Sequence, residues 1–137
     1  MKVENGELKM SEQLKMIEKK ENIVMNKSYA FALRIIKLYK HLIAEQKEYV
    51  LSKQVLRSGT AIGALVKEAE HAQSKADFIN KMNIALKEAN ETEYWLMLLK
   101  DSDYLDEKNF SSIRFDNVEL IKLLASIVKT SKETLKK

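Results

Sequence analysis

The sequence predicts an all-α fold, namely an up-down-up-down antiparallel four-helix bundle over residues 26–137. The chain of 137 residues contains no proline and only three glycines, so it has almost none of the residues that tight hairpin turns require. Apolar residues instead recur at helical spacing in four segments separated by short polar stretches. With 45% apolar and 32% charged residues, the composition fits amphipathic helices around one core and not a disordered chain.

Residues 1–25 are expected to form a loosely attached N-terminal arm. They hold five basic and five acidic side chains, and Leu8, Leu14 and Ile17 fit a short amphipathic helix with little surface to bury. The arm lacks the apolar stretch of a secretory signal. No run in the chain approaches the roughly 18 apolar residues of a membrane span, so we expect a cytoplasmic protein with no membrane partner.

The first helix is predicted to begin at Asn26 or Lys27 and to end near Ala44. At 100° per residue its apolar side chains fall within one arc of roughly 160°. The opposite arc carries no acid and consists of Lys27, Arg34, Lys37, Lys40 and His41. This helix therefore has one apolar side and one purely basic side.

A second helix is predicted from about Tyr49 to Ala72, after a turn at residues 45–48. Gly59 and Gly63 lie four residues apart inside it, and each costs about 1 kcal/mol relative to alanine in a helix. We expect close approach of another helix at these two glycines to compensate. The polar side of the second helix includes Lys53, Arg57 and Lys67.

The third helix is predicted to begin after Ser74, because serine followed three residues later by Asp77 resembles a capping box. Its heptad seam runs from Phe78 to Leu99. A helix that is apolar over most of its circumference is normally central, and a four-helix bundle has no central helix, so we expect a homo-oligomer. The additional apolar positions are Ile79, Leu86 and Met97 on one flank of the seam, and Ile84, Trp95 and Leu98 on the other.

The fourth helix is predicted to follow Asp106, a favourable N-cap residue. It ends in a lysine-rich segment, and cations are stabilised near a helix C-terminus by the helix dipole. Its apolar residues continue in heptad steps through Phe110, Ile113, Leu120, Leu124 and Ile127.

Charge is unevenly distributed along the chain, although the net charge is only +4. Residues 26–67 carry eight basic and two acidic side chains, whereas residues 68–119 carry six basic and twelve acidic ones. The sequence therefore predicts one electropositive and one electronegative region on a single domain.

No residue pattern predicts catalysis, a cofactor or a metal site. The absence of cysteine excludes disulfides, thiolate zinc sites, iron–sulfur clusters and cysteine nucleophiles. Glu68 and His71 form one Glu-x-x-His motif, whereas di-iron bundles use two. Glu88 and Glu91 share a helix face without a nucleophile or phosphate-binding motif beside them, so we expect them to pair with a basic residue such as Arg57.

The basic faces of the first two helices favour non-specific binding of RNA or DNA through phosphate contacts. A solvated lysine-rich surface with no ligand is the alternative explanation of the same pattern. The alternative function is a protein-interaction scaffold that presents the acidic region to a protein partner. The candidate nucleic-acid-binding residues are Lys27, Arg34, Lys37, Lys40, Lys53, Arg57 and Lys67.

Three segments carry a family resemblance: SGTAIG at 58–63, SKADF at 74–78 and KEANETEYWL at 87–96. With their surroundings over residues 22–132, they resemble the four-helix-bundle proteins of 23S ribosomal RNA intervening sequences. The resemblance implies a cytoplasmic bacterial four-helix bundle whose relatives assemble into barrel-shaped homopentamers, and we therefore expect a ring-like homopentamer. The missing catalytic motifs lead us to expect a non-enzymatic protein. A related branch, the accessory proteins of diversity-generating retroelements, binds nucleic acid and a reverse transcriptase through a positive surface. By that analogy the corresponding surface is formed by Arg34, Lys37, Lys40, Lys53 and Arg57.

Overall fold

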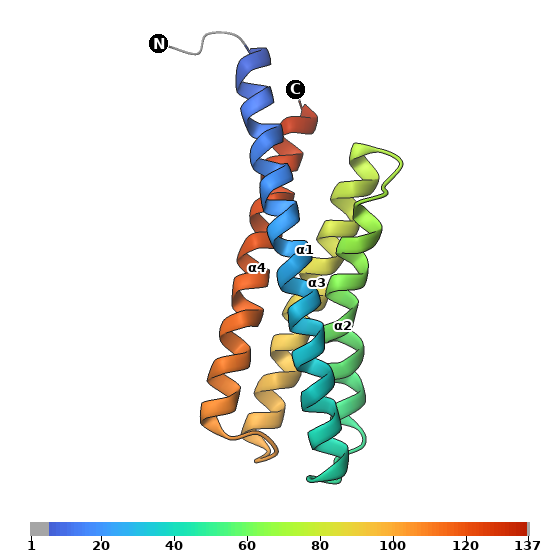
Figure 1. Ribbon diagram of the computed structural model, residues 1–137, viewed down its shortest axis with the longest axis vertical. Helices are drawn as coiled ribbons and strands as arrows, with labels where there is room; N and C mark the ends of the chain where they lie inside the picture. Colours follow the sequence, from blue (N-terminus) through green and yellow to red (C-terminus); the bar gives the residue numbers. More distant parts are fainter. Residues whose placement is uncertain (1–5, 137) are drawn as a thin grey trace.

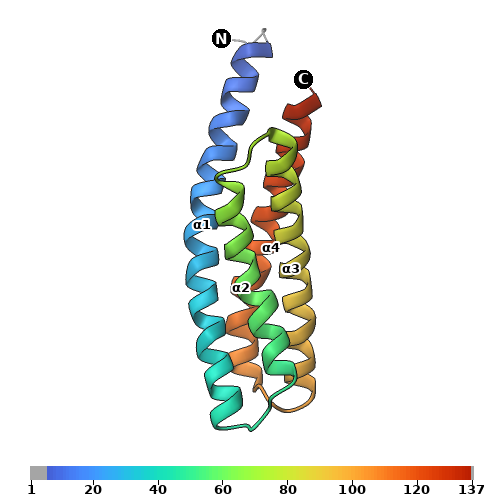
Figure 2. The same ribbon diagram turned by 90° about the vertical axis from the view of Figure 1, so that its right-hand side faces the viewer.

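The computed structural model describes residues 6–136, which form four α-helices and no strand. The helices are α1 (Gly6–Ala44), α2 (Leu51–Ala69), α3 (Lys75–Asp101) and α4 (Glu107–Lys136). Figures 1 and 2 show them side by side along one long axis. The all-α prediction and the number of helices in the predicted domain are confirmed.

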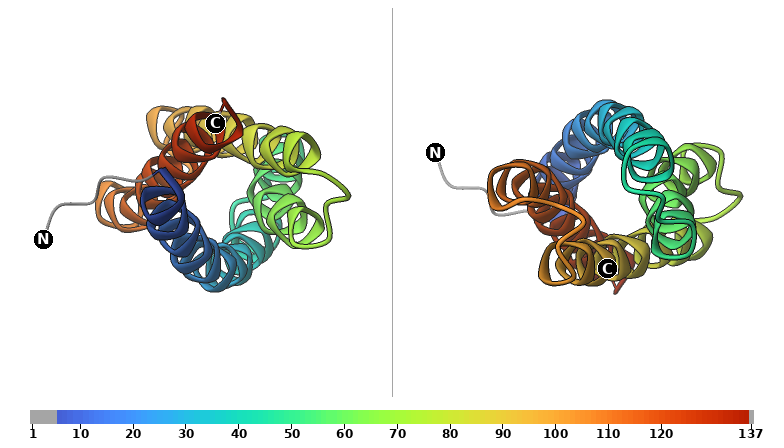
Figure 3. Two further views of the ribbon diagram at one scale, coloured as in Figure 1. Left: turned by 90° about the horizontal axis from the view of Figure 1, so that it is seen from above. Right: turned by 90° about the horizontal axis from the view of Figure 1, so that it is seen from below.

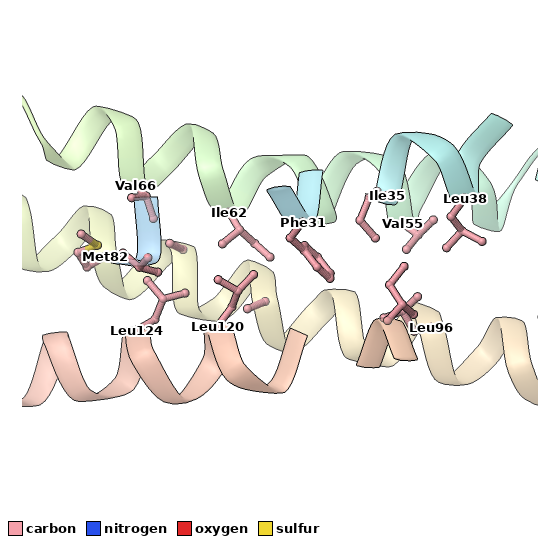
Figure 4. Close-up of a cluster of buried hydrophobic side chains, with 14 of the residues drawn as sticks. Phe31, Ile35, Leu38, Val55, Ile62, Val66, Met82, Leu96, Leu120 and Leu124 are labelled. Carbon is pink, nitrogen blue, oxygen red and sulfur yellow. The ribbon is translucent and has the colours of Figure 1, made fainter. Parts of the chain in front are cut away.

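Each helix packs against two neighbours. α1 lies beside α2 and α4, α3 lies beside the same two helices, and within residues 6–136 the backbones of the diagonal pairs are not neighbours. Seen from above and below in Figure 3, the four helices therefore surround a common centre. Buried side chains from all four helices converge there, including Phe31, Ile62, Met82, Leu96 and Leu120 (Figure 4).

The predicted start of the first helix is wrong, because α1 begins at Gly6 instead of near residue 26. Ile17 and Val24 are buried, and the Lys20 ammonium donates a hydrogen bond to the Ser126 hydroxyl of α4. The physical reason is visible in Figure 1, where α4 extends beyond the α2–α3 connection and provides a neighbour for this part of α1. Of the arm predicted over 1–25, residues 1–5 lie outside the described part of the chain.

α2 begins at Leu51, two residues later than predicted, and the side chain of Glu48 caps it. The Glu48 carboxylate accepts hydrogen bonds from the backbone N–H groups of Val50 (3.1 Å), Leu51 (3.0 Å) and Ser52 (2.7 Å). Burial raises the pKa of Glu48, but the hydrogen bonds together lower it by more than burial raises it, so the pKa lies below the usual value of 4.5. The residues 45–48, predicted as a turn, therefore include the cap of the next helix.

The predicted caps of α3 and α4 are confirmed. The Ser74 hydroxyl accepts a hydrogen bond from the backbone N–H of Asp77 at 3.0 Å, and the Asp106 carboxylate accepts one from the N–H of Asn109 at 2.8 Å. Both side chains satisfy N–H groups that a helix N-terminus leaves free. α2 ends at Ala69, three residues before the predicted end.

The two glycines of α2 mark a close contact with α1, as their spacing predicts. A Cβ atom on Gly59 would lie 2.7 Å from Cγ1 of Ile35, and one on Gly63 would lie 3.4 Å from the backbone oxygen of Ser28. The contact joins two helices of the same chain. It is tighter at Gly59 than at Gly63.

Candidate nucleic-acid interface

Three of the predicted phosphate-binding lysines remain free. Lys37 and Lys40 of α1 and Lys53 of α2 are exposed, and none forms a hydrogen bond or ion pair with another residue in the described range. Lys37 and Lys40 lie near the end of α1 and Lys53 near the start of α2, on either side of the short connection between these helices. Three lysines without an ion-pair partner among the described residues therefore lie toward the end of the molecule where α1 passes into α2.

Two further candidates, both on α1, pair with acids of α4. The Lys27 ammonium lies 3.2 Å from the Glu119 carboxylate. The Arg34 guanidinium lies 2.8 Å from the Asp116 carboxylate and also donates to the hydroxyl of Ser112 at 2.9 Å. Exposed ion pairs contribute only about 0–1 kcal/mol, but they lower the local positive charge. Part of the basic face predicted for residues 26–44 is therefore neutralised by the neighbouring helix α4.

Arg57 is held by the two glutamates that its position on α2 predicts as partners. Its guanidinium lies 3.2 Å from the Glu88 carboxylate and also bonds to that of Glu91. Glu91 in addition accepts a hydrogen bond from the indole N–H of Trp95 at 2.8 Å. Arg57 therefore links α2 to α3, and it is less available to a phosphate than the three free lysines.

The last basic candidate and the packing candidates occupy different environments. Lys67 is strongly exposed and lies 3.9 Å from Glu70, a weak contact one turn away. Ile79 is buried in the core of its own chain, whereas Met97 is 46% exposed. Leu86 and Trp95 are half-buried and pack against the core of the same chain.

Several exposed apolar side chains were not singled out from the sequence. Phe115 of α4 is 72% exposed, and Tyr29 of α1 and Tyr94 of α3 are also exposed. Phe115 lies outside the heptad positions of α4. An aromatic residue off the heptad is the sequence pattern from which its exposure could have been predicted. These residues add to Met97 as surface that a second copy or another protein can bury.

A cavity of about 560 Å³ lies at the same end of the molecule as the free lysines. Its lining includes Arg34, Lys37 and His41 of α1, together with Asp103 and Tyr104 from the α3–α4 connection. We did not predict this cavity from the sequence, because residues 102–106 were predicted only to form a polar connection between two helices.

Residues 20–126 match the family model of the 23S rRNA-intervening sequence protein. The chain belongs to this family. It is also similar to a solved structure from Bacteroides thetaiotaomicron, described as a protein of unknown function from the S23 ribosomal protein family. That relative is 62% identical, with a TM-score of 0.79, over 80% of this chain and 98% of the other. No curated protein matches the chain.

The family match leaves out both ends of this 23S rRNA-intervening sequence protein. It begins inside α1 and stops inside α4, so residues 6–19 and 127–136 lie beyond the matched region. The two segments come together in space, because the Thr134 hydroxyl donates to the side chain of Gln13 at 3.5 Å. The matched region contains all of α2 and α3 and all three free lysines.

The described residues of this 23S rRNA-intervening sequence protein contain no group of three or more potential metal ligands among His, Cys, Asp and Glu. The His71 imidazole lies 3.4 Å from the carboxylate of Glu70, on the residue next to it in sequence. Over the same residues, no helix combines the length and apolar character needed to cross a lipid bilayer.

Proposed function

We propose that this 23S rRNA-intervening sequence protein is a non-catalytic, cytoplasmic up-down-up-down bundle that binds RNA or DNA through its free lysines. The observation that carries the proposal is the gathering of Lys37, Lys40 and Lys53, exposed and without acidic partners among the described residues, at one end of the molecule. Lysines in this arrangement suit phosphate contacts that position a nucleic acid without reading its bases. Lys27, Arg34, Arg57 and Lys67 contribute less, because each already contacts a carboxylate.

We further propose that the protein forms a ring-like homo-oligomer of five copies. The exposed apolar side chains Phe115, Tyr94 and Met97 support burial against a second copy. A ring would repeat the three free lysines in each copy and raise the apparent affinity for a long nucleic acid. Light scattering is expected to give about 80 kDa, five times the chain mass of 15.9 kDa. A mass of 15.9 kDa at micromolar concentration would contradict this part of the proposal.

Fluorescence anisotropy with a structured RNA at two salt concentrations tests nucleic-acid binding. The double variant Lys37→Glu with Lys53→Glu removes two free lysines. For each phosphate that the variant no longer neutralises, the slope of log affinity against log salt is expected to become shallower by roughly 0.7–0.9. The matched control is Lys87→Glu with Lys132→Glu, which changes two other exposed lysines and alters the net charge equally.

Binding that is absent at low salt, or that both double variants weaken equally, would refute the assignment. The single variant Arg57→Gln is expected to change affinity little, because its guanidinium is occupied by two glutamates. A large effect of that variant with unchanged stability would place the interface on α2 and α3 instead.

A protein-interaction scaffold is the second candidate function, with a reverse transcriptase or another protein as partner. The exposed side chains of Phe115 and Tyr94 favour it, because aromatic residues are enriched at protein interfaces. A purification that recovers a protein after nuclease treatment, combined with no salt-dependent RNA affinity, would support the scaffold over nucleic-acid binding.

A further inference from the structure

The cavity beside the free lysines has the size of a small-molecule site. Its volume of about 560 Å³ lies within the range of roughly 300–1,000 Å³ that ligand pockets occupy. It is bounded by the end of α1, the α3–α4 connection and the start of α4. These elements are brought together only by the packing of α1 against α4.

The two sides of the cavity carry opposite charge. α1 contributes the cations Arg34 and Lys37, and the α3–α4 connection contributes the acids Asp103 and Asp106. The lining also includes apolar and aromatic side chains, among which Tyr104 is half-buried. A ligand with an anionic group, a flat apolar body and hydrogen-bond donors would match these three kinds of lining residue.

Only one of the two acids is free to receive such donors. Both carboxylate oxygens of Asp106 already accept hydrogen bonds from Asn109, from the backbone N–H at 2.8 Å and from the side-chain amide at 3.0 Å. Asp103 is exposed, and its carboxylate has no partner among the described residues. Its backbone φ of 66° places it at a turn after α3. Asp103 thus lines the cavity, and its carboxylate has two adjacent acceptor oxygens without a partner in the described range.

Guanine has the complementary edge, because its ring N1–H and its 2-amino group are adjacent donors on the Watson–Crick side. Adenine, cytosine and uracil do not present two adjacent donors there. On the opposite side of the cavity Lys37 is free for a phosphate, whereas Arg34 is held by Asp116. Unpaired bases are commonly recognised by their Watson–Crick edge together with contact to an aromatic ring.

We propose that this cavity binds one unpaired guanine nucleotide of the nucleic acid held by the free lysines. The base contacts Tyr104, its Watson–Crick edge bonds to Asp103, and its phosphate lies at Lys37. This inference rests on the proposed function and adds a base preference to it. RNA and DNA both carry this guanine edge and this phosphate, so either nucleic acid can supply the nucleotide.

Fluorescence anisotropy with hairpins that differ at one loop position tests the proposal. The loop carries guanine, inosine or adenine, in an RNA set and a DNA set. The protein is expected to bind the guanine loop about tenfold more tightly than the adenine loop, as one good bidentate pair allows. Inosine lacks the 2-amino group and is expected to fall between them. Comparison of the two sets shows which nucleic acid is the source.

Asp103→Asn is the informative variant, because asparagine tolerates a positive φ but cannot accept both guanine donors. It is expected to abolish the guanine preference while leaving the salt-dependent affinity for all hairpins. The matched control is Asp101→Asn, which changes another exposed acid, the last residue of α3, outside the cavity lining. The control is expected to keep the full tenfold preference.

Guanosine 5′-monophosphate provides an independent readout. Adding it to the isotope-labelled protein is expected to shift the amide resonances of Asp103 and Tyr104, whereas adenosine 5′-monophosphate leaves them unchanged. Equal affinity for guanine and adenine loops, with salt-dependent binding retained, would overturn the guanine site and leave the proposed function standing. No affinity for any hairpin at low salt would overturn both.

Discussion

Alanine substitutions at the two glycines of α2 are expected to change stability in opposite directions. At Gly59 the new Cβ would lie 2.7 Å from Cγ1 and 2.9 Å from Cγ2 of Ile35. Ile35 is fully buried, so neither atom can move aside without disturbing the core. At Gly63 the nearest atom is the Ser28 backbone oxygen at 3.4 Å, which is ordinary van der Waals contact.

The magnitudes follow from two competing effects. Alanine gains about 1 kcal/mol over glycine inside a helix, and overpacking a core costs about 1–3 kcal/mol. Gly59→Ala is therefore expected to lower the free energy of unfolding by about 1 kcal/mol. Gly63→Ala is expected to raise it by up to about 1 kcal/mol. For a chain of this size, 1 kcal/mol shifts the melting temperature by about 4 °C.

Urea and thermal unfolding followed by circular dichroism at 222 nm measure both variants at one protein concentration, because self-association affects apparent stability. The further variant Ile35→Ala removes the side-chain atoms that would clash. Combined with Gly59→Ala, it should destabilise less than the two single changes added together. A Gly59→Ala protein as stable as the Gly63→Ala protein would refute the reasoning.

Three other substitutions test polar groups. Glu48→Gln is expected to lower the free energy of unfolding by about 1–2 kcal/mol at pH 7. Burial raises the pKa of Glu48 in the folded protein, but three hydrogen bonds from backbone N–H groups bring it below 4.5, so the stability difference between variant and parent should disappear as the pH falls through that pKa. A stability difference that persists at pH 2 in urea unfolding would contradict this expectation. Burial first, and then repulsion from Glu70, raise the pKa of Glu21 above 4.5. Glu21→Gln should therefore be more stable than the parent at pH 7 and lose that advantage as the pH falls through the raised pKa toward 4.5; equal melting temperatures at pH 7 would argue against it. The buried Asn117 side chain donates a hydrogen bond to the Ala89 carbonyl at 3.0 Å, but its own amide oxygen accepts no bond within the described residues. Asn117→Leu should therefore raise the free energy of unfolding by about 1 kcal/mol. Destabilisation of this variant in urea unfolding would show that the hydrogen bond to Ala89 outweighs the unpaired oxygen.

The sequence was enough to predict which basic residues belong to the candidate interface, but not which of them are free of ion-pair partners. The basic face predicted for residues 26–44 is a property of residue spacing. α1 also includes residues 6–25, and Glu12 falls on the same arc as Lys37 and Arg34 at 100° per residue. Whether a given cation is free depends on residues far away in the chain: Arg34 pairs with Asp116, 82 positions later, while Lys37 has no partner in the described range. Arg57 shows that a pair can be anticipated when both partners lie on helix faces expected to meet.

The sequence alone determined the helical class, the number of helices in the bundle, and the caps at Ser74 and Asp106, because periodicity and capping are local interactions within a few residues. Only the tertiary structure decided that α1 extends back to Gly6, since its first turns are covered by the distant C-terminal part of α4. The same holds for the free lysines and for the cavity at Asp103. Each depends on which helices become neighbours, and that choice is made by burial of the shared core.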